Sequence, residues 1–139
     1  MFLQKINMSH KLLYKELNEQ FNPGEEANPD RFVEYIVNIP KNLEIYVLKN
    51  NENEILGCGT LIIEQKMIHN CSKVGHIEDV FIRNQFRGNG YGEYLIINLK
   101  EIAKKANCYK VILDCDTKLE GFYKKNGFES KNIQMSVYF

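Results

Sequence analysis

The residues that most clearly suggest chemistry are three glycines at alternating positions, Gly88, Gly90 and Gly92, which follow a strand-like run from His76 to Arg83. Glycine lets the backbone come close to a ligand and turn several N–H groups toward one anion. A helical pattern begins directly after the glycines, and the positive end of a helix dipole strengthens such a site. The stretch therefore predicts a cradle for a phosphate group.

The spacing of these glycines excludes two common phosphate-binding motifs. A P-loop needs Lys and Ser or Thr after its last glycine, whereas Glu93 and Tyr94 follow Gly92 here. The dinucleotide fingerprint Gly-x-Gly-x-x-Gly fails from Gly88 and from Gly90, because its third glycine would fall on Glu93 or on Leu95. Arg87-x-x-Gly90-x-Gly92 is the pattern that remains, and an ordinary glycine turn is the alternative.

Length and composition indicate one α/β domain over residues 1–139. The 18 basic and 18 acidic residues give zero formal net charge, which does not favour nucleic acid or a membrane surface as a partner. We expect no membrane span and no signal peptide. The four cysteines lack metal-ligand spacing, and Cys58 and Cys115 lie in apolar runs. We therefore expect buried free thiols, no metal and a cytoplasmic location.

The hydrophobic periodicity places the glycine turn inside a β-α-β unit, so the strands on either side of that unit should be parallel. A ligand would then bind at the carboxyl edge of the parallel pair. The expected elements, in order, are helices over 9–20 and 29–39, strands over 43–48, 55–68 and 76–83, a helix over 91–106, a strand over 109–115, a short helix over 118–125 and a closing strand over 133–139.

This element order and the Arg87-x-x-Gly90-x-Gly92 turn resemble the GCN5-related N-acetyltransferases (GNAT), whose signature turn binds the pyrophosphate of acetyl-CoA. Further stretches are similar to one branch, the glucosamine 6-phosphate N-acetyltransferases of UDP-N-acetylglucosamine biosynthesis. The resemblance is strong from about Ile55 to Met135. The stretches are Glu64–His69 (EQKMIH), Gly75–Val80 (GHIEDV), Cys108–Cys115 (CYKVILDC) and Gly121–Phe128 (GFYKKNGF).

The resemblance implies the single-domain GNAT acyl-CoA N-acyltransferase fold, with a mixed central sheet and flanking helices. It implies an enzyme that transfers acetyl from acetyl-CoA to the 2-amino group of D-glucosamine 6-phosphate. The amine would attack the thioester directly in a ternary complex, without a metal or a covalent enzyme intermediate. The products would be N-acetyl-D-glucosamine 6-phosphate and CoA. A homodimer with a shared substrate site is also implied.

The motif match assigns most cofactor contacts to the backbone. Val80, Phe81 and Ile82 would pair with the pantetheine arm as an added strand does, and plain core packing of their side chains is compatible with this. One N–H near Val80 would stabilise the oxyanion, an interaction worth roughly 3 kcal/mol. The residues that would hold the pyrophosphate are Arg87, Gly88, Asn89, Gly90, Tyr91, Gly92 and Glu93.

Tyr123 is the expected general acid, because a phenol beside the thioester sulfur can protonate the departing thiolate. Glu78 and Asp79 are neighbours and should face opposite sides of a strand, which argues against a paired dyad. By resemblance both help to bind the amino sugar, and a solvated strand end is the alternative. The Asp114 backbone carbonyl would orient the amine and lie near the cofactor. The sequence does not identify the general base.

The sugar phosphate requires cations, and Lys66 and Lys110 are the candidates. Two departures from the family pattern bear on this site. Tyr138 stands where the family often has a phosphate-binding Arg, and Leu119 stands where many GNAT members have an Asn at the cofactor. The full set of expected substrate residues is Lys66, Met67, Ile68, His69, Glu78, Asp79, Val80, Tyr109 and Lys110.

Two other functions fit part of the sequence. The first is a GNAT acetyltransferase for another amine, such as a polyamine or a protein N-terminus, which the absent Arg favours. The second is a non-catalytic acetyl-CoA-binding module, against which the presence of Tyr123 argues.

Overall fold

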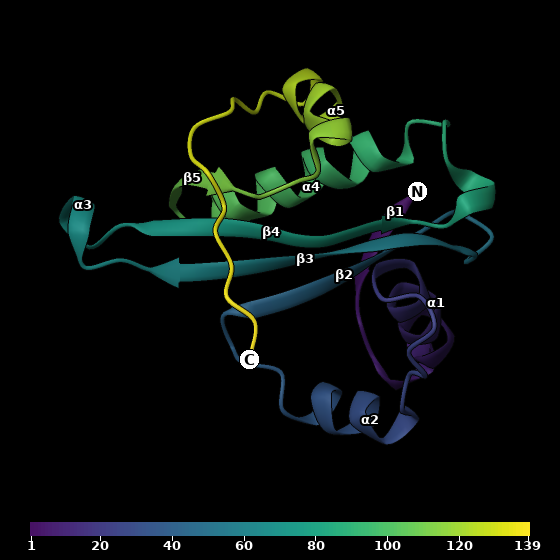
Figure 1. The fold of residues 1–139 in the computed structure, drawn as a ribbon. Coiled ribbons are helices and arrows are strands. Elements are labelled where there is room, and N and C mark those ends of the chain that lie inside the picture. Colours follow the sequence, from purple (N-terminus) through teal and green to yellow (C-terminus); the bar gives the residue numbers. More distant parts are fainter.

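In a computed structural model that describes residues 1–139, a five-stranded sheet lies between two layers of helices (Figure 1). Neighbouring strands are antiparallel except β4 and β5, which are parallel as the β-α-β pattern predicts. The α/β fold class with a mixed sheet is therefore confirmed. In spatial order the strands are β1 (Phe2–Lys5), β2 (Leu43–Lys49), β3 (Ile55–Gln65), β4 (Lys73–Ile82) and β5 (Cys108–Ile112).

The helices divide between the two faces of the sheet (Figure 1). α1 (Lys11–Phe21) and α2 (Pro29–Val37) cover one face, and α4 (Tyr91–Lys105) and α5 (Glu120–Lys125) cover the other. The short α3 (Ile68–Cys71) forms the tip of the β3–β4 hairpin. None of these helices has both the length and the apolar character needed to span a bilayer.

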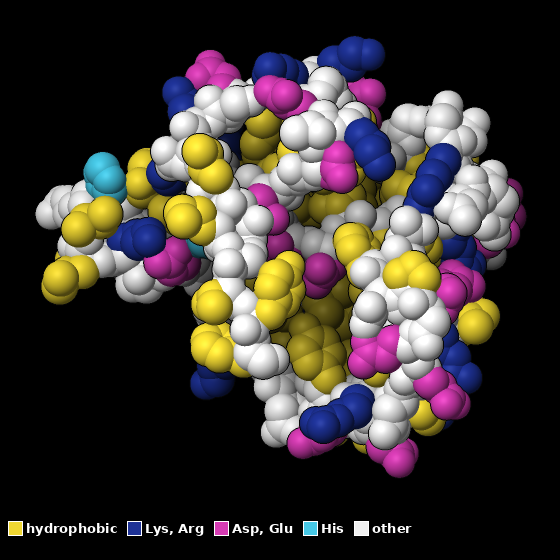
Figure 2. All heavy atoms as spheres, viewed as in Figure 1, with side chains coloured by type: hydrophobic (Ala, Val, Ile, Leu, Met, Phe, Trp, Pro, Cys, Tyr) yellow, Lys and Arg dark blue, Asp and Glu magenta, His cyan; other side chains and the backbone are white.

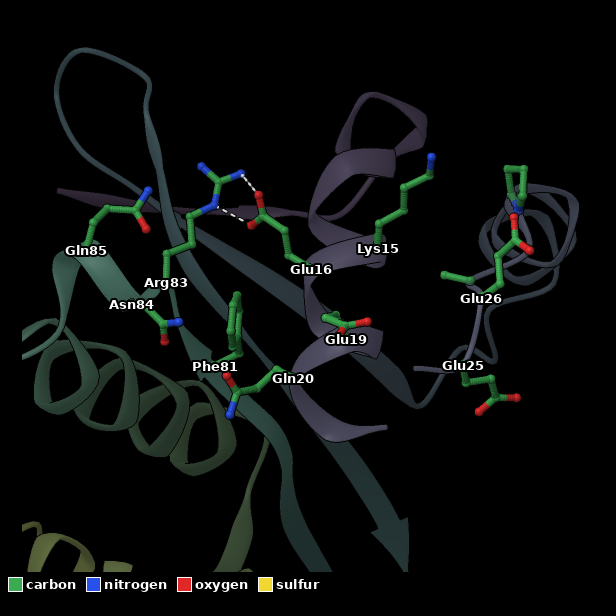
Figure 3. Close-up of a pocket in the computed structure, with 12 residues that line it drawn as sticks. Lys15, Glu16, Glu19, Gln20, Glu25, Glu26, Phe81, Arg83, Asn84 and Gln85 are labelled. Carbon is green, nitrogen blue, oxygen red and sulfur yellow. Dashed lines mark hydrogen bonds and ion pairs between the residues drawn. The ribbon is translucent and has the colours of Figure 1, made fainter. Parts of the chain in front are cut away.

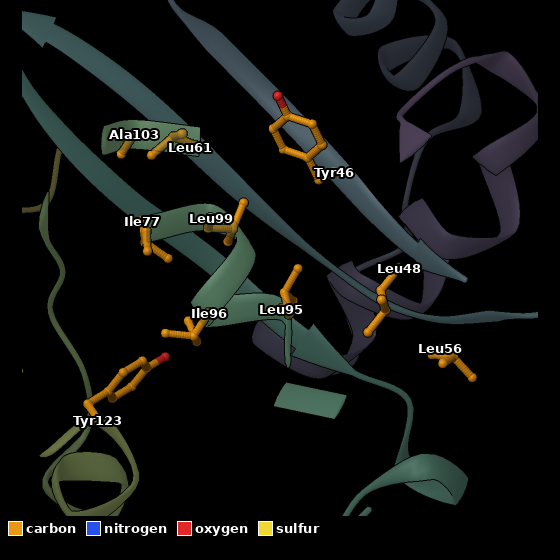
Figure 4. Close-up of a cluster of buried hydrophobic side chains, with 10 residues drawn as sticks. All are labelled: Tyr46, Leu48, Leu56, Leu61, Ile77, Leu95, Ile96, Leu99, Ala103 and Tyr123. Carbon is orange, nitrogen blue, oxygen red and sulfur yellow. The ribbon is translucent and has the colours of Figure 1, made fainter. Parts of the chain in front are cut away.

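The larger part of the core lies between the sheet and α4, as the helical periodicity predicts (Figure 4). Leu95, Ile96, Leu99 and Ala103 of α4 are fully buried there. A smaller cluster on the opposite face packs Leu13 of α1 against the strands. Its other members are Val47, Cys58 and Phe81.

α2 begins at Pro29 as expected, whereas the first helical segment begins earlier than expected. Asn28 accepts a hydrogen bond from the Asp30 N–H at 2.9 Å and caps α2. The first turn is capped by Asn7, two residues before the expected start at residue 9. Asn7 accepts from the Ser9 N–H, and the His10 Nδ1 accepts from the Asn7 N–H at 3.0 Å, which completes a capping box.

One strand was not expected, and the expectations for two others are corrected. β1 was not predicted, because its residues become a strand only by pairing with β2. The strand expected over 109–115 ends at Ile112, beyond which β4 and β5 no longer pair. The closing strand expected over 133–139 is absent from the single chain, where Ile133 and Met135 are 89% and 88% exposed. Its alternating apolar residues have no strand partner here.

A β-bulge interrupts β4 at Asp79 and Val80. Cys58 pairs with Phe81 and Thr60 pairs with Glu78, so one residue of β3 faces two residues of β4. Asp79 takes a left-handed conformation with φ of 49°. Such bulges bend the strand and redirect side chains, and they are common beside active sites.

His10 is an unusual member of the interior, because it is 1% exposed and its Nε2 atom has no hydrogen-bond partner. Burial lowers the pKa of His10, and the charge of nearby Lys49 adds to this effect. The fold therefore favours the neutral imidazole, whereas the unfolded chain protonates it below a pKa of ~6.5.

We expect the free energy of unfolding to fall as pH drops below ~6.5, by about 1.4 kcal/mol for each unit of pKa depression. His10→Gln keeps an acceptor for the Asn7 N–H and removes the titration. Urea unfolding at pH 7.5 and pH 5.5 should show a smaller acid loss for the variant. An equal loss in both proteins would contradict the assignment to His10.

Candidate active site

The candidate site lies at the point where β4 and β5 separate. Their pairing ends at His76 and Ile112, and β4 continues for six more residues to Ile82. Over that stretch one side of β4 remains paired with β3, and the side toward β5 has no strand partner. Unpaired backbone groups need partners. This edge can therefore accept an extended ligand as an added strand, at the position expected for Val80, Phe81 and Ile82.

Three carboxylates converge at this opening. Asp114 follows the end of β5 by two residues and lies near enough to Glu78 for its charge to act on that carboxylate. The bulge interrupts the alternation of Glu78 and Asp79, so the prediction that they face opposite sides of a regular strand is wrong here. Loss of solvation raises the pKa of Glu78, and the Asp114 and Asp79 charges add to this. Loss of solvation and then Asp114 likewise raise the pKa of Asp79.

Tyr123 of α5 lies beside the same group. It is 8% exposed, its ring points from α5 toward Ile96 of α4, and its hydroxyl makes no hydrogen bond to another protein group (Figure 4). Burial raises the pKa of Tyr123, and Cys115 and Asp114 contribute further. The phenol therefore stays protonated at neutral pH and can donate a proton.

The face of the molecule shown in Figure 2 has a hollow beside the C-terminal segment. Acidic side chains lie in the middle of the hollow above an apolar floor, and the C-terminal segment passes beside it. Cys115 follows β5 and is exposed, which corrects the expectation that it is buried. Cys58 is buried as predicted, and burial raises its pKa to about 12.

The glycine turn has the geometry of an anion cradle. Gly88 and Gly90 both have φ of 79°, a conformation that favours glycine, and a Cβ on either would meet no atom within 4 Å. The open space over these residues lies at the N-terminus of α4, where Gly90 is the N-cap. A Cβ on Gly92 would lie 3.3 Å from the Phe122 ring, so this third glycine packs closely against α5.

Arg87 is held by α1, a contact that the sequence did not reveal. Its Nε donates to the Ile82 carbonyl at 2.8 Å, and its NH2 donates to the Gln20 Oε1 at 3.2 Å. Both partners are neutral, so Arg87 keeps its charge beside the cradle. Arg83 differs, because two hydrogen bonds of 2.6 and 3.1 Å to Glu16 neutralise it.

A second polar group lies at the other end of β4 and β5. The His69 ring stands 4.9 Å from the Tyr109 ring, and the Lys110 ammonium lies 5.5 Å over the latter. Lys66 is paired with Glu64 at 2.6 Å, and His76 contacts the other Glu64 oxygen at 2.6 Å. These two contacts lower the pKa of Glu64.

The hairpin tip beside this group is strained. His69, Asn70 and Cys71 have φ of 51°, 58° and 55°, and consecutive left-handed residues other than glycine are rare. The turn leaves Met67 88% exposed and Ile68 58% exposed. The exposed apolar side chains of Met67 and Ile68 therefore lie at the tip of the β3–β4 hairpin, which projects beyond the rest of the sheet (Figure 1).

A single chain does not bring the two polar groups together. Lys110 pairs with Val74, which lies four residues before Glu78 and hence about 13 Å along the strand. Glu78, Asp79, Val80, Asp114 and Tyr123 thus form one group. Lys66, Met67, Ile68, His69, Tyr109 and Lys110 belong to the other end of the strands.

A cavity of about 680 Å³ lies on the α1 side of Phe81 (Figure 3). Neither Asp114 nor Tyr123 lines it. Its charged lining consists of four glutamates against Lys15 and Arg83, and Glu16 pairs with Arg83. Such a lining repels a pyrophosphate, so the cofactor arm fits the opening between β4 and β5 better than this cavity.

Residues 10–128 match the family model described as the acetyltransferase (GNAT) family, which defines the class of this chain. A glucosamine 6-phosphate N-acetyltransferase 1 of Dictyostelium discoideum is 42% identical over 129 residues, 90% of this chain and 82% of the relative. The Candida albicans enzyme is 39% identical over 101 residues, 73% and 68% of the two chains. The chain belongs to the glucosamine 6-phosphate N-acetyltransferase family.

Solved structures agree with this assignment. The crystal structure of glucosamine-6-phosphate N-acetyltransferase from Arabidopsis thaliana has a TM-score of 0.85 and 36% identity, and covers 99% of this chain and 97% of its own. A Trypanosoma brucei acetyltransferase has a TM-score of 0.87 and 30% identity, with 99% of both chains covered. The expected GNAT fold is therefore confirmed.

Gly90→Val is expected to weaken acetyl-CoA binding about tenfold or more, or at least about 1.4 kcal/mol. The new side chain would strain the left-handed backbone and occupy the open space over the turn. Isothermal titration with acetyl-CoA measures the effect. Gly24→Val is the matched control, because Gly24 has φ of 84° and open surroundings but lies between α1 and α2. Unchanged affinity in Gly90→Val, or an equal loss in both variants, would contradict the cradle.

Proposed function

We propose that this protein is a glucosamine 6-phosphate N-acetyltransferase, which moves acetyl from acetyl-CoA to the 2-amino group of D-glucosamine 6-phosphate. The observation that carries the proposal is the convergence of Glu78, Asp79, Asp114 and Tyr123 where β4 and β5 part. That arrangement stands on a chain that matches this family over most of its length.

The residues present fit acetyl-CoA. The turn from Arg87 to Glu93 offers open backbone N–H groups at a helix N-terminus, together with the unneutralised Arg87 charge. The unpaired edge of β4 offers hydrogen bonds to an amide-containing arm through Val80 to Ile82. When bound, acetyl-CoA supplies an activated acetyl thioester.

The carboxylates bind the amine and take its proton. The amino sugar enters as an ammonium ion, which three clustered acidic groups attract. The raised pKa values of Glu78 and Asp79 make these groups better proton acceptors than ordinary surface carboxylates. The Asp114 carbonyl orients the amine for attack on the thioester carbon.

Tyr123 and the β4 bulge act on the thioester, through its leaving thiolate and its developing oxyanion. The protonated Tyr123 hydroxyl donates to the departing thiolate, for which its free hydroxyl and raised pKa suit it. We assign to a backbone N–H near Val80, at the bulge, the stabilisation of the developing oxyanion, an interaction worth roughly 3 kcal/mol. The amine proton leaves through the carboxylates and the thiolate proton comes from Tyr123.

Lys110 is the cation that we assign to the sugar phosphate. Tyr138, at the place of the family's usual Arg, is 93% exposed and uncharged. Lys66 is partly neutralised by Glu64, whereas no carboxylate pairs with Lys110. His69 and Tyr109 beside Lys110 add hydrogen-bonding groups to the same position.

A homodimer solves the separation of the two polar groups. About 13 Å of strand divides the backbone of Lys110 from that of Glu78, so the two polar groups lie at different ends of the β4–β5 pair. A second copy can place its hairpin end over the first copy's carboxylates and complete the site in trans. The exposed apolar side chains of Met67, Ile133 and Met135 give such a dimer an interface.

The acceptor specificity is tested by CoA release from acetyl-CoA, followed by chromatography to avoid the protein's own thiols. We expect turnover with glucosamine 6-phosphate and a kcat/KM about a hundredfold lower with glucosamine, because each lost charge-assisted contact is worth ~1.5–3 kcal/mol. Lys110→Met should reduce the preference for the phosphorylated sugar.

The controls separate this function from its alternatives. Spermidine and a peptide N-terminus serve as other amine acceptors, and turnover of either in place of the sugar would overturn the substrate assignment. Tight acetyl-CoA binding without turnover of any amine would indicate a binding module instead of an enzyme.

The shared site is tested by mixing two variants, each expected to lose most of its activity with glucosamine 6-phosphate. Asp79→Asn damages the carboxylate group and Lys110→Met damages the hairpin end. Co-refolded chains should recover about a quarter of wild-type activity, because half of the dimers are mixed and each has one intact site. If each chain built its own site, no mixture would recover activity, and a monomer by light scattering would equally contradict the proposal.

A further inference from the structure

α5 carries Tyr123 but is too short to hold its own position. It has six residues, Glu120–Lys125, and isolated helices below ~12 residues are marginal in water. Its placement therefore depends on contacts made by its ends and by its aromatic side chains. Any residue that fixes α5 also fixes the direction of the Tyr123 hydroxyl.

The C-terminus of α5 ends in a Schellman cap. The Phe128 N–H donates to the Tyr123 carbonyl at 3.1 Å, and the Gly127 N–H donates to the Lys124 carbonyl at 3.0 Å. Gly127 has φ of 85°, as this cap requires. The hydrophobic contact that accompanies the cap joins Tyr123 to Phe128, with ring centroids 5.8 Å apart. The cap thus acts directly on the candidate acid.

Lys100 of α4 attaches this cap to the core helix. Its Nζ donates to the Asn126 carbonyl at 2.6 Å and lies 5.6 Å from the centre of the Phe128 ring. It also approaches the backbone of Gly127, where an added Cβ would lie 3.3 Å from Nζ. Asn126 is 7% exposed, so the carbonyl end of α5 is enclosed and needs a donor.

Lys100 lies on a part of α4 whose neighbouring residues are buried in the core. Its neighbour on α4, Leu99, is fully buried, and so is Ile96 one turn earlier. Ile96 is also the residue toward which the Tyr123 ring points (Figure 4). The ammonium of Lys100 and the side chain of Ile96 therefore hold Tyr123 from two sides, one through the cap and one through the ring.

We propose that Lys100 is a positioning residue for the acetyl-transfer reaction. It anchors the cap of α5 to α4, and it thereby aims the Tyr123 hydroxyl at the leaving thiolate. This inference rests on the proposed function, because it assigns Lys100 a role through Tyr123. Lys100 does not contact the reacting atoms.

The test compares two variants. Lys100→Met keeps a long unbranched side chain but removes the hydrogen-bond donor and the positive charge. Lys100→Arg keeps the donor and the charge. Lys104→Met is the matched control, because Lys104 is exposed one turn further along α4. We expect Lys100→Met to lower kcat about tenfold with KM unchanged, within the ~100-fold range that a small misplacement of a catalytic group can cost. Lys100→Arg should restore most of kcat, and Lys104→Met should match wild type.

A double variant distinguishes positioning from general support of the fold. In a Tyr123→Phe background there is no hydroxyl to aim, so Lys100→Met should cause no further fall in kcat. A full tenfold loss in that background, or no loss in the single variant, would overturn the proposal. An equal loss in Lys104→Met would do the same.

Hydrogen exchange gives a readout that does not depend on the substrate. Lys100→Met should speed exchange of the Asn126, Gly127 and Phe128 amides, which bond to α5 carbonyls, and Lys104→Met should not. Unchanged exchange in Lys100→Met would refute the anchoring role. Faster exchange in a protein that acetylates no amino sugar would place the failure in the proposed function, because the anchor would still be present.

Discussion

The parting of β4 and β5 is the constraint on which the rest of the site depends. Two parallel strands share hydrogen bonds as far as His76 and Ile112, and beyond that point each must satisfy its backbone otherwise. β5 turns away into the loop that carries Asp114. β4 continues along β3 with one edge open. That single divergence creates both the slot for an extended cofactor arm and the place where residues from the two strands meet.

The bulge and the glycines of β3 make this divergence possible. Gly57 lies so close to β4 that a Cβ on it would fall 2.1 Å from the Phe81 carbonyl oxygen. β3 can therefore follow β4 through the bend without a clash. The bend places Asp79 near Glu78 and Asp114 instead of leaving it on the far face. The geometry of the candidate site follows from backbone fit between two antiparallel strands, and the pKa values of Glu78 and Asp79 are raised where these carboxylates and Asp114 lie near one another.

The sequence pattern predicted those helices and strands that are determined by residues close together in the chain. The spacing of Leu95, Leu99 and Ala103 predicted a helix with one buried face, because this signal acts within a few residues. The features that the sequence did not reveal need a distant partner. β1 exists because Phe2–Lys5 meets β2, and the Asp79 bulge exists because Gly59 faces two residues.

The candidate site shows the same division. The motifs indicated Tyr123, Glu78, Asp79 and Asp114, and the structure places them together. The sequence could not show that Gln20 holds Arg87, since 67 residues separate them. It also suggested a closing strand after Ile133, because alternation predicts a strand without saying whether one chain offers it an edge.

The charges of the site follow from the charges of the proposed reactants. The chain has no net charge, yet both substrates are anions and the attacking amine begins as a cation. Carboxylates that attract the ammonium would repel both phosphates if all three sites coincided. The fold separates them: backbone N–H groups at the start of α4 for the pyrophosphate, carboxylates at the strand opening, and Lys110 with His69 at the hairpin end. In a single chain the last two of these groups lie about 13 Å apart along the strand, and this separation reduces the repulsion between the carboxylates and a sugar phosphate.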